Sequence, residues 1–209
     1  MKLGIIGLPQ SGKTTLFNAL TQGDIPTGIS GSQLSVHTAV IDVPDDRIAA
    51  LSDLFHPPKI VHAKVTYADI AGLDGESSKS GISGPLHNTL SAMDGFIHVV
   101  RHFDNPHVPH FAGSVNPQRD LAAMEAELIL NDLIVVERKL ERLDEERQRG
   151  GYGRDKTLVV REKDLFLKLQ EALSQEIPLR YLIFSEEETK ALSNYGFLSK
   201  KPQLIVINQ

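Results

Sequence analysis

Eight consecutive residues near the start of the chain form a phosphate-binding motif. Residues 7–14 read GLPQSGKT and match G-x-x-x-x-G-K-[ST] in full. Glycines let backbone N–H groups approach a phosphate, and the helix that follows favours an anion at its N-terminus. The motif predicts a nucleotide site rather than a ligand-free turn. Its expected residues are Gly7, Pro9, Gln10, Ser11, Gly12, Lys13, Thr14 and Thr15.

Two side chains of this motif have distinct expected roles. Lys13 would neutralise the β- and γ-phosphates, and the hydroxyl of Thr14 would bind Mg²⁺. A second motif, DIAG at residues 69–72, would complete the site. Asp69 ends a predicted strand, where a carboxylate can hold the metal, usually through water. The backbone N–H of Gly72 would contact the γ-phosphate.

The two motifs together indicate a nucleotide switch. D-x-x-G alone is common by chance, but here it follows the phosphate-binding motif by about 55 residues and comes after a strand and before a glycine-rich loop. This arrangement predicts a GTPase or ATPase rather than a metabolic kinase or a motor. A P-loop small-molecule kinase would need a basic lid and a substrate-binding acid, and neither is clear.

The residue after the second motif bears on catalysis. Ras-like enzymes have a glutamine there that orients the attacking water, whereas this chain has Leu73, which cannot hydrogen-bond water. We therefore expect slow intrinsic hydrolysis, with Lys13, Asp69, Gly72 and Leu73 as the catalytic set. The alternative is a scaffold that binds nucleotide without hydrolysing it.

Four histidines lie close together further along the chain. His98, His102, His107 and His110 fall within 13 residues, but their spacing matches no metal-ligand pattern. Two lie on or just after a predicted strand, and two flank prolines in a loop. We interpret them as ordinary histidines rather than as a metal site.

The surrounding elements must position the two motifs. Buried strands are expected at 2–7, 36–43, 63–68, 96–101 and 204–208, and helices at 13–22 and 47–55. A strand, a glycine-rich turn and a helix in this order predict the α/β fold of P-loop NTPases, a mostly parallel sheet flanked by helices.

A long charged segment interrupts this pattern. From 119 to about 149, Ala122, Ala126, Ile129, Leu133, Val136, Leu140 and Leu143 alternate spacings of four and three, as in a coiled coil. The segment GGYG at 150–153 ends this helix, and a second helix follows with Val159, Phe166, Leu169 and Leu173 on one face. We predict an inserted antiparallel helical coiled-coil hairpin; the alternative is two ordinary helices packed on the sheet. The expected division is a nucleotide-binding domain at 1–112, the insertion at 113–177, and the continued domain at 178–209.

Charge and composition limit the partners. The net charge is −5 and there is no cysteine, which disfavours a non-specific DNA-binding surface and excludes disulfides and zinc–thiolate sites. No apolar run is long enough for a membrane span, so a cytoplasmic protein is expected. The hairpin tip is locally basic and could contact ribosomal RNA phosphates, or could be a solvated loop. Its charged residues are Arg147, Arg149, Arg154 and Lys156, with Asp155.

Four segments resemble the YchF/Obg-like ATPases. They are the phosphate-binding motif with its GLP start, DIAGL at 69–73, HVVRHF at 98–103 and VNP at 115–117. The resemblance runs over nearly the whole chain and implies a nucleotide hydrolase that associates with ribosomes. It also implies that family members continue beyond the point where this chain stops, at the end of a core strand.

Three positions depart from the family or match it only in part. Gln10 replaces an asparagine that is linked in related proteins to a potassium ion. The effector-loop threonine has no clear counterpart: Gln33 falls at its place, and Ser32, Ser35 or Thr38 are substitutes. Asn208 matches the asparagine that recognises the base, while the nucleotide is left as GTP or ATP.

Overall fold

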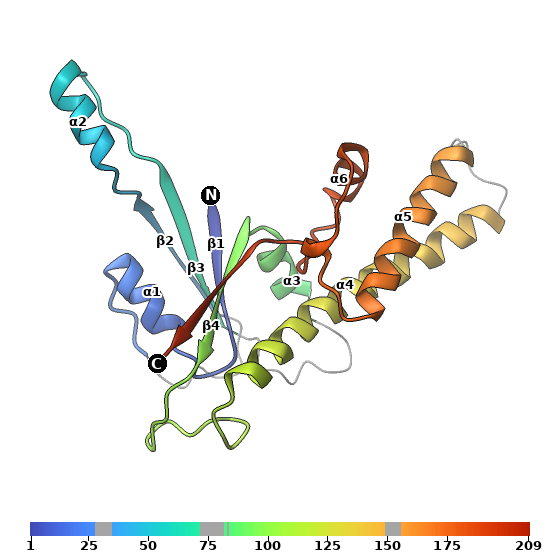
Figure 1. Cartoon of the computed structure of the whole chain (residues 1–209), viewed down its shortest axis with the longest axis horizontal. Helices are drawn as coiled ribbons and strands as arrows, with labels where there is room; N and C mark the ends of the chain where they lie inside the picture. Colours follow the sequence, from blue (N-terminus) through green and yellow to red (C-terminus); the bar gives the residue numbers. More distant parts are fainter. Residues whose placement is uncertain (28–34, 72–81, 83, 149–155) are drawn as a thin grey trace.

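The computed structural model describes residues 1–27, 35–71, 82, 84–148 and 156–209. A five-stranded sheet lies at its centre, with helices on both faces (Figure 1). The strands are β1 (Lys2–Ile6), β2 (Val36–Asp42), β3 (Lys64–Ile70), β4 (Gly95–Arg101) and β5 (Gln203–Asn208). The helices are α1 (Lys13–Thr21), α2 (Asp46–Phe55), α3 (Gly84–Ser91), α4 (Pro117–Gln148), α5 (Lys156–Ser174) and α6 (Glu186–Leu192), with a 3-10 turn η1 (Leu179–Tyr181).

The sheet is mostly parallel, as the sequence predicts. Its strand order is β2-β3-β1-β4-β5. Strand β1 pairs in parallel with β3 and β4, and β4 pairs in parallel with β5, whereas β2 runs antiparallel to β3. The four parallel strands therefore end at one edge of the sheet, where ligands bind in α/β folds of this kind.

Alternating strand residues form a core on each face of the sheet. On one face, Ile5, Ile97 and Val99 pack with Phe17 of α1. On the other face, the apolar cluster combines strand residues with helical residues from α3 and α4. Its buried members are Ile6, Leu8, Ala68, Ile70, Ile82, Leu86, Leu90, Phe96, Met124, Leu128 and Leu198. The three central strands are thus covered on both faces. The edge strands β2 and β5 are largely exposed, so the expectation that 36–43 and 204–208 are buried strands is wrong, because each edge strand pairs with a neighbour on one side only and carries little of the core.

Helix α4 belongs to two cores along its length of 32 residues. Near its start, Met124 and Leu128 pack on the sheet. Further along, Ile129, Val136 and Leu140 pack instead against Leu165, Phe166, Leu169 and Leu173 of α5. Helices α4 and α5 form a hairpin that projects from the sheet (Figure 1).

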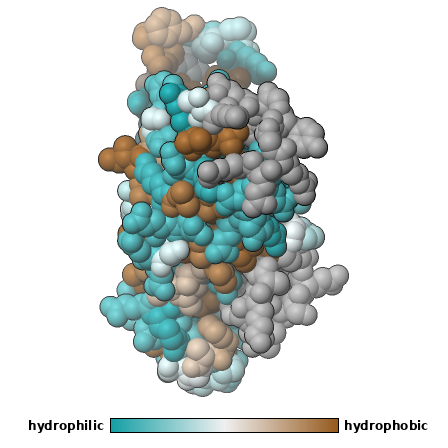
Figure 2. Space-filling view, turned by 90° about the vertical axis from the view of Figure 1, so that its right-hand side faces the viewer, coloured by the Kyte–Doolittle hydropathy of each residue, from teal (hydrophilic) through white to brown (hydrophobic). Residues whose placement is uncertain are grey.

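The expected heptad pattern is correct for the outer part of α4 and wrong for the first part. Leu133 is half-buried and Val136, Leu140 and Leu143 are buried, but Ala122 and Ala126 are exposed. The reason is that the sheet, not α5, covers the beginning of α4, so the buried face there passes through Met124 and Leu128. A core contact thus overrides the helical periodicity. Figure 2 shows the molecule from the right-hand side of Figure 1, where the described surface mixes hydrophilic and hydrophobic residues.

Two shorter helices, α3 and α6, complete the fold. Helix α3 was not expected, and it buries Leu86 and Leu90 against the sheet. Helix α6 begins with a reciprocal capping box, in which Ser185 and Glu188 bond each other's backbone N–H groups. The basic side chains of the hairpin tip lie outside the described part of the chain. Among the described helices, none is long and apolar enough to cross a membrane.

Candidate nucleotide-binding site

The turn between β1 and α1 is built around two glycines. Gly7 has φ +150° and Gly12 has φ +97°. A Cβ atom at Gly7 would lie 2.3 Å from the carbonyl oxygen of Val99, and one at Gly12 would lie 2.3 Å from the side-chain nitrogen of Asn208. Side chains are therefore excluded at both positions, which keeps the backbone of the loop accessible.

Lys13 closes the loop on itself. Its Nζ atom donates to the carbonyl oxygens of Gly7 at 2.9 Å and Leu8 at 3.0 Å. The backbone N–H of Ser11 donates to Leu8 O at 3.3 Å, and that of Leu16 to Gly12 O at 2.9 Å, which starts α1. An ammonium group thus lies at the N-terminus of a helix, and both favour an anion there.

Thr14 and Asp69 meet beside this loop. The hydroxyl of Thr14 donates to Oδ2 of Asp69 at 2.7 Å. Strand β3 carries Asp69, which pairs with Ile5 of β1, so the parallel pairing brings the two motifs together. The other carboxylate oxygen, Oδ1, is buried and has no hydrogen-bond partner among the described residues. The hydroxyl and the carboxylate are hard oxygen ligands that lie side by side, and Oδ1 of Asp69 is available to a further ligand. This arrangement suits Mg²⁺.

Asn208 connects the last strand to the loop. Its Nδ2 donates to the carbonyl oxygen of Ser11 at 3.0 Å. Strand β5 pairs with β4 in register, so Asn208 lies opposite Arg101 at the same edge as Asp69. The end of the last strand therefore contacts the loop that follows the first strand.

The other expected site residues are placed as follows. Pro9 and Gln10 lie in the loop, where Gln10 has a positive φ of 61°, and Thr15 is exposed in α1. Of the substitutes for the effector-loop threonine, Ser35 bonds His37 at 3.0 Å and Thr38 pairs with Ala68 in the sheet. Gly72, Leu73, Ser32 and Gln33 lie outside the described residues.

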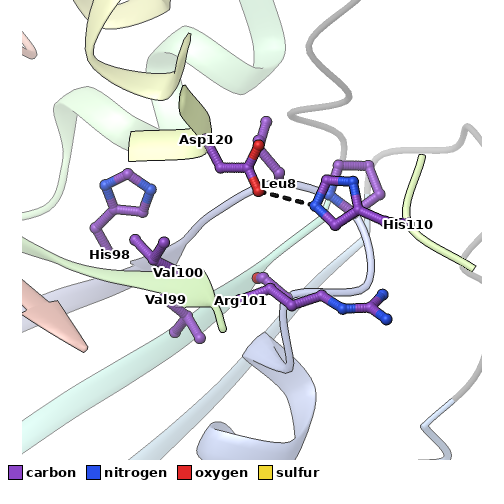
Figure 3. Close-up of a pocket in the computed structure, with 9 residues that line it drawn as sticks. Leu8, His98, Val99, Val100, Arg101, His110 and Asp120 are labelled. Atoms are coloured by element: carbon purple, nitrogen blue, oxygen red, sulfur yellow. Dashed lines mark hydrogen bonds and ion pairs between the residues drawn. The ribbon is translucent and has the colours of Figure 1, made fainter. Parts of the chain in front are cut away.

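A group of polar side chains outside the two nucleotide motifs lines a small pocket beside the phosphate-binding loop (Figure 3). Nε2 of His110 lies 2.8 Å from Oδ2 of Asp120, and both side chains are almost fully buried. Arg101 donates to the carbonyl oxygens of Phe103 and Val108. These contacts fix the segment between β4 and α4. Leu8, Pro9 and Ser11 of the loop line the same pocket as His98, Arg101, His110 and Asp120.

His98 is a buried neutral imidazole in this group. Its Nδ1 accepts a hydrogen bond from the Gln203 amide at 2.8 Å. Burial, with the nearby charges of Lys13 and Arg180, lowers the pKa of His98 to about 4. His98 and His110 thus have separate partners from different elements. The sequence drew attention to His98 and Arg101 through the segment HVVRHF and to His110 through the four clustered histidines, but it did not indicate the contact between His110 and Asp120.

Comparisons with known proteins agree on the family. Residues 2–139 match the family model described as 50S ribosome-binding GTPase. The chain is 35% identical over 207 residues to the ribosome-binding ATPase YchF of Bacillus subtilis, covering 98% of this chain and 55% of that protein. It is 34% identical over 212 residues to Obg-like ATPase 1 of Xenopus laevis, covering 100% of this chain and 52% of that protein.

A solved structure also matches. The structure of the Schizosaccharomyces pombe YchF GTPase superposes with a TM-score of 0.76 at 30% sequence identity, covering 100% of this chain and 56% of that one. The chain therefore spans about half the length of the relatives that it matches.

Proposed function

Because this chain belongs to the 50S ribosome-binding GTPase family, and within it to the YchF/Obg-like ATPases, we propose that it is a nucleotide-dependent switch. It binds GTP or ATP with Mg²⁺, hydrolyses the nucleotide slowly, and associates with the ribosome in the cytoplasm. The names of its relatives support both the nucleotide and the ribosome.

The contact between Thr14 and Asp69 carries this proposal. The 2.7 Å hydrogen bond joins the hydroxyl of the phosphate-binding motif to the carboxylate of D-x-x-G. Both side chains would hold Mg²⁺, with Asp69 acting directly or through water. When bound, Mg²⁺ supplies positive charge that neutralises the phosphates and the charge that develops on them during hydrolysis.

The loop itself would bind the triphosphate. Its backbone N–H groups and the N-terminus of α1 favour the phosphates, and the ammonium group of Lys13 neutralises the β- and γ-phosphates. Gly72 would contact the γ-phosphate through its N–H, and Asn208 would face the base. Gly7, Pro9, Gln10, Ser11, Gly12 and Thr15 complete the proposed binding residues.

Slow hydrolysis is proposed because Leu73 has no polar atom with which to orient water. Positioning of the attacking water is then left to backbone groups, to the substrate phosphate or to a partner. The second candidate function, a scaffold that binds nucleotide without turnover and recruits a partner through its hairpin, follows from the same residue.

Turnover measurements separate the two functions. The natural full-length protein would be incubated with Mg²⁺ and either GTP or ATP, with and without ribosomes. A slow rate that ribosomes increase supports the switch, whereas tight binding with no turnover under either condition supports the scaffold. For the hairpin tip, charge reversal at Arg147 and Lys156 should weaken ribosome binding and leave nucleotide affinity intact, if the tip contacts RNA phosphates.

A further inference from the structure

Asp132 is a fully buried carboxylate in the middle of α4. Leu128 and Val136, one turn before and after it, are also fully buried, so the surrounding face of the helix is apolar. Aspartate is almost never fully buried unless it is paired or hydrogen-bonded, because desolvating the charge is costly. The proposed nucleotide chemistry does not use Asp132, so its burial needs another explanation.

The carboxylate of Asp132 holds two consecutive backbone groups. Oδ1 accepts a hydrogen bond from the N–H of Leu198 at 2.9 Å, and Oδ2 accepts one from the N–H of Ser199 at 2.7 Å. Charge-assisted bonds of this kind are stronger than neutral ones and fix the backbone that donates them. Asp132 thereby fixes the chain immediately before β5.

A second contact from α4 supports the same turn. Arg180 donates to the carbonyl oxygen of Ser199 from its backbone N–H and from Nη1, each at 3.1 Å. The guanidinium group also forms an ion pair with Glu125 of α4. Glu125 and Asp132 are about two helical turns apart. Helix α4 therefore holds Ser199 at two points.

Strand β5 leads from this turn to the phosphate-binding loop. It begins at Gln203, whose amide bonds His98, and it ends at Asn208, whose side chain bonds Ser11 of the loop. Because β5 is a regular strand paired along its length with β4, the position of Leu198 and Ser199 sets where the strand begins. That position in turn sets how Asn208 meets the loop.

We propose that Asp132 is a positioning residue that couples the helical hairpin to the nucleotide site. It does so by holding the backbone of Leu198 and Ser199, and through β5 the contact between Asn208 and the loop. A partner that displaces α4 changes the affinity for nucleotide, and nucleotide changes the affinity for that partner by the same factor. This inference rests on the proposed nucleotide-binding function.

The test compares two variants of the natural full-length protein. Asp132→Asn keeps the size of the side chain but turns an N–H donor toward a backbone N–H. Leu140→Ala is the matched control, because Leu140 is buried in the hairpin core about two helical turns beyond Asp132. The Kd for fluorescent GTP and ATP analogues with Mg²⁺ is measured for each variant, together with Tm.

Asp132→Asn should raise the Kd about tenfold, since it removes a charge-assisted acceptor. Leu140→Ala should lower Tm but leave the Kd within about twofold of wild type. Hydrogen exchange should become faster at the amides of Leu198 and Ser199 in Asp132→Asn only. If Asp132→Asn does not fold, Glu125→Gln tests the ion pair between Glu125 and Arg180 instead, with an expected rise in Kd of about threefold.

Three results would overturn the inference. One is an unchanged Kd in every folded variant of Asp132 and Glu125. Another is an equal rise in Kd for Leu140→Ala at an equal loss of Tm, because the effect would then reflect general destabilisation. The third is a wild-type protein that binds neither nucleotide, which would overturn the proposed function as well and is recognised by the wild-type titration alone.

Discussion

The hydroxyl of Thr14 donates a 2.7 Å hydrogen bond to the carboxylate of Asp69, although the two residues lie 55 positions apart in the chain. Parallel pairing of β1 and β3 produces this contact, because both strands end at the same edge of the sheet. It joins the two motifs that the sequence suggests for binding a phosphate and a metal.

This contact predicts a specific dependence on Mg²⁺. Thr14→Ala and Asp69→Asn should each reduce the gain in nucleotide affinity that Mg²⁺ provides by about tenfold, because each removes an oxygen donor. Affinity without the metal should change much less. Thr89→Ala is a matched control, since the Thr89 hydroxyl donates to the carbonyl oxygen of Pro85 within α3. Titrations with and without EDTA measure both effects, and equal loss under both conditions would contradict the metal role.

Leu73 provides a test of the hydrolytic mechanism. Its side chain cannot hydrogen-bond water, so Leu73→Ala should leave the slow single-turnover rate within about threefold of wild type, far from the loss of about a hundredfold or more that follows removal of a catalytic hydrogen-bond donor. Measured hydrolysis that is fast in the wild type and abolished by Leu73→Ala would argue against this assignment.

Two buried groups predict opposite effects of pH on stability. Burial lowers the pKa of His98 to about 4, so the unfolded state takes up a proton first and stability is lost as pH falls from about 6.5 toward 4. Burial raises the pKa of Asp132 to about 6, despite the hydrogen bonds that it accepts from Ser199 and Leu198. Here the folded state takes up a proton first, and stability is gained as pH falls through 6 toward 3.8.

Each pKa shift changes the free energy of unfolding by about 3 kcal/mol in full, and the two changes have opposite signs. They therefore largely cancel between pH 6 and 4 in the wild type. Replacing one group should expose the other. As the pH falls from 7 to 5, the free energy of unfolding of His98→Gln should rise relative to that of the wild type, and that of Asp132→Asn should fall relative to it. Urea unfolding at both pH values measures these differences. Identical pH dependence in the wild type and both variants would show that neither group is shifted as stated.

The double role of α4 predicts which of its residues are sensitive to substitution. Leu128→Ala should cost about 2–5 kcal/mol of unfolding free energy, because it empties a fully buried position against the sheet. Ala126→Glu should change stability by no more than about 0.5 kcal/mol, because Ala126 is exposed. Denaturant unfolding measures both losses. A larger loss of unfolding free energy in Ala126→Glu than in Leu128→Ala would indicate that α5, not the sheet, covers the first part of α4.

The sequence predicts features that depend on short-range patterns. The phosphate-binding loop, the strands that flank it and the positions of Thr14 and Asp69 follow from motifs and from runs of apolar residues. Residues that only tertiary contacts bring together could not be predicted in this way. His110 and Asp120, for example, are ten positions apart in segments of different structure, and nothing in their spacing indicates a buried pair.

Periodicity also misled where two surfaces compete for one helix. Ala122 and Ala126 continue the heptad pattern of α4, but the sheet covers the face that carries Met124 and Leu128. Asp132 was not singled out because an aspartate in a highly charged helix is normally exposed. Its role depends on Leu198 and Ser199, which lie more than sixty residues away.

The most direct test of the central claim is a calorimetric titration of the natural full-length protein with GTP and with ATP in the presence of Mg²⁺. We expect saturable binding of at least one of the two nucleotides, and a loss of affinity of about a hundredfold in Lys13→Ala, since this change removes the ammonium group at the phosphates. Absence of binding at millimolar nucleotide, or wild-type affinity in a folded Lys13→Ala protein, would contradict the account.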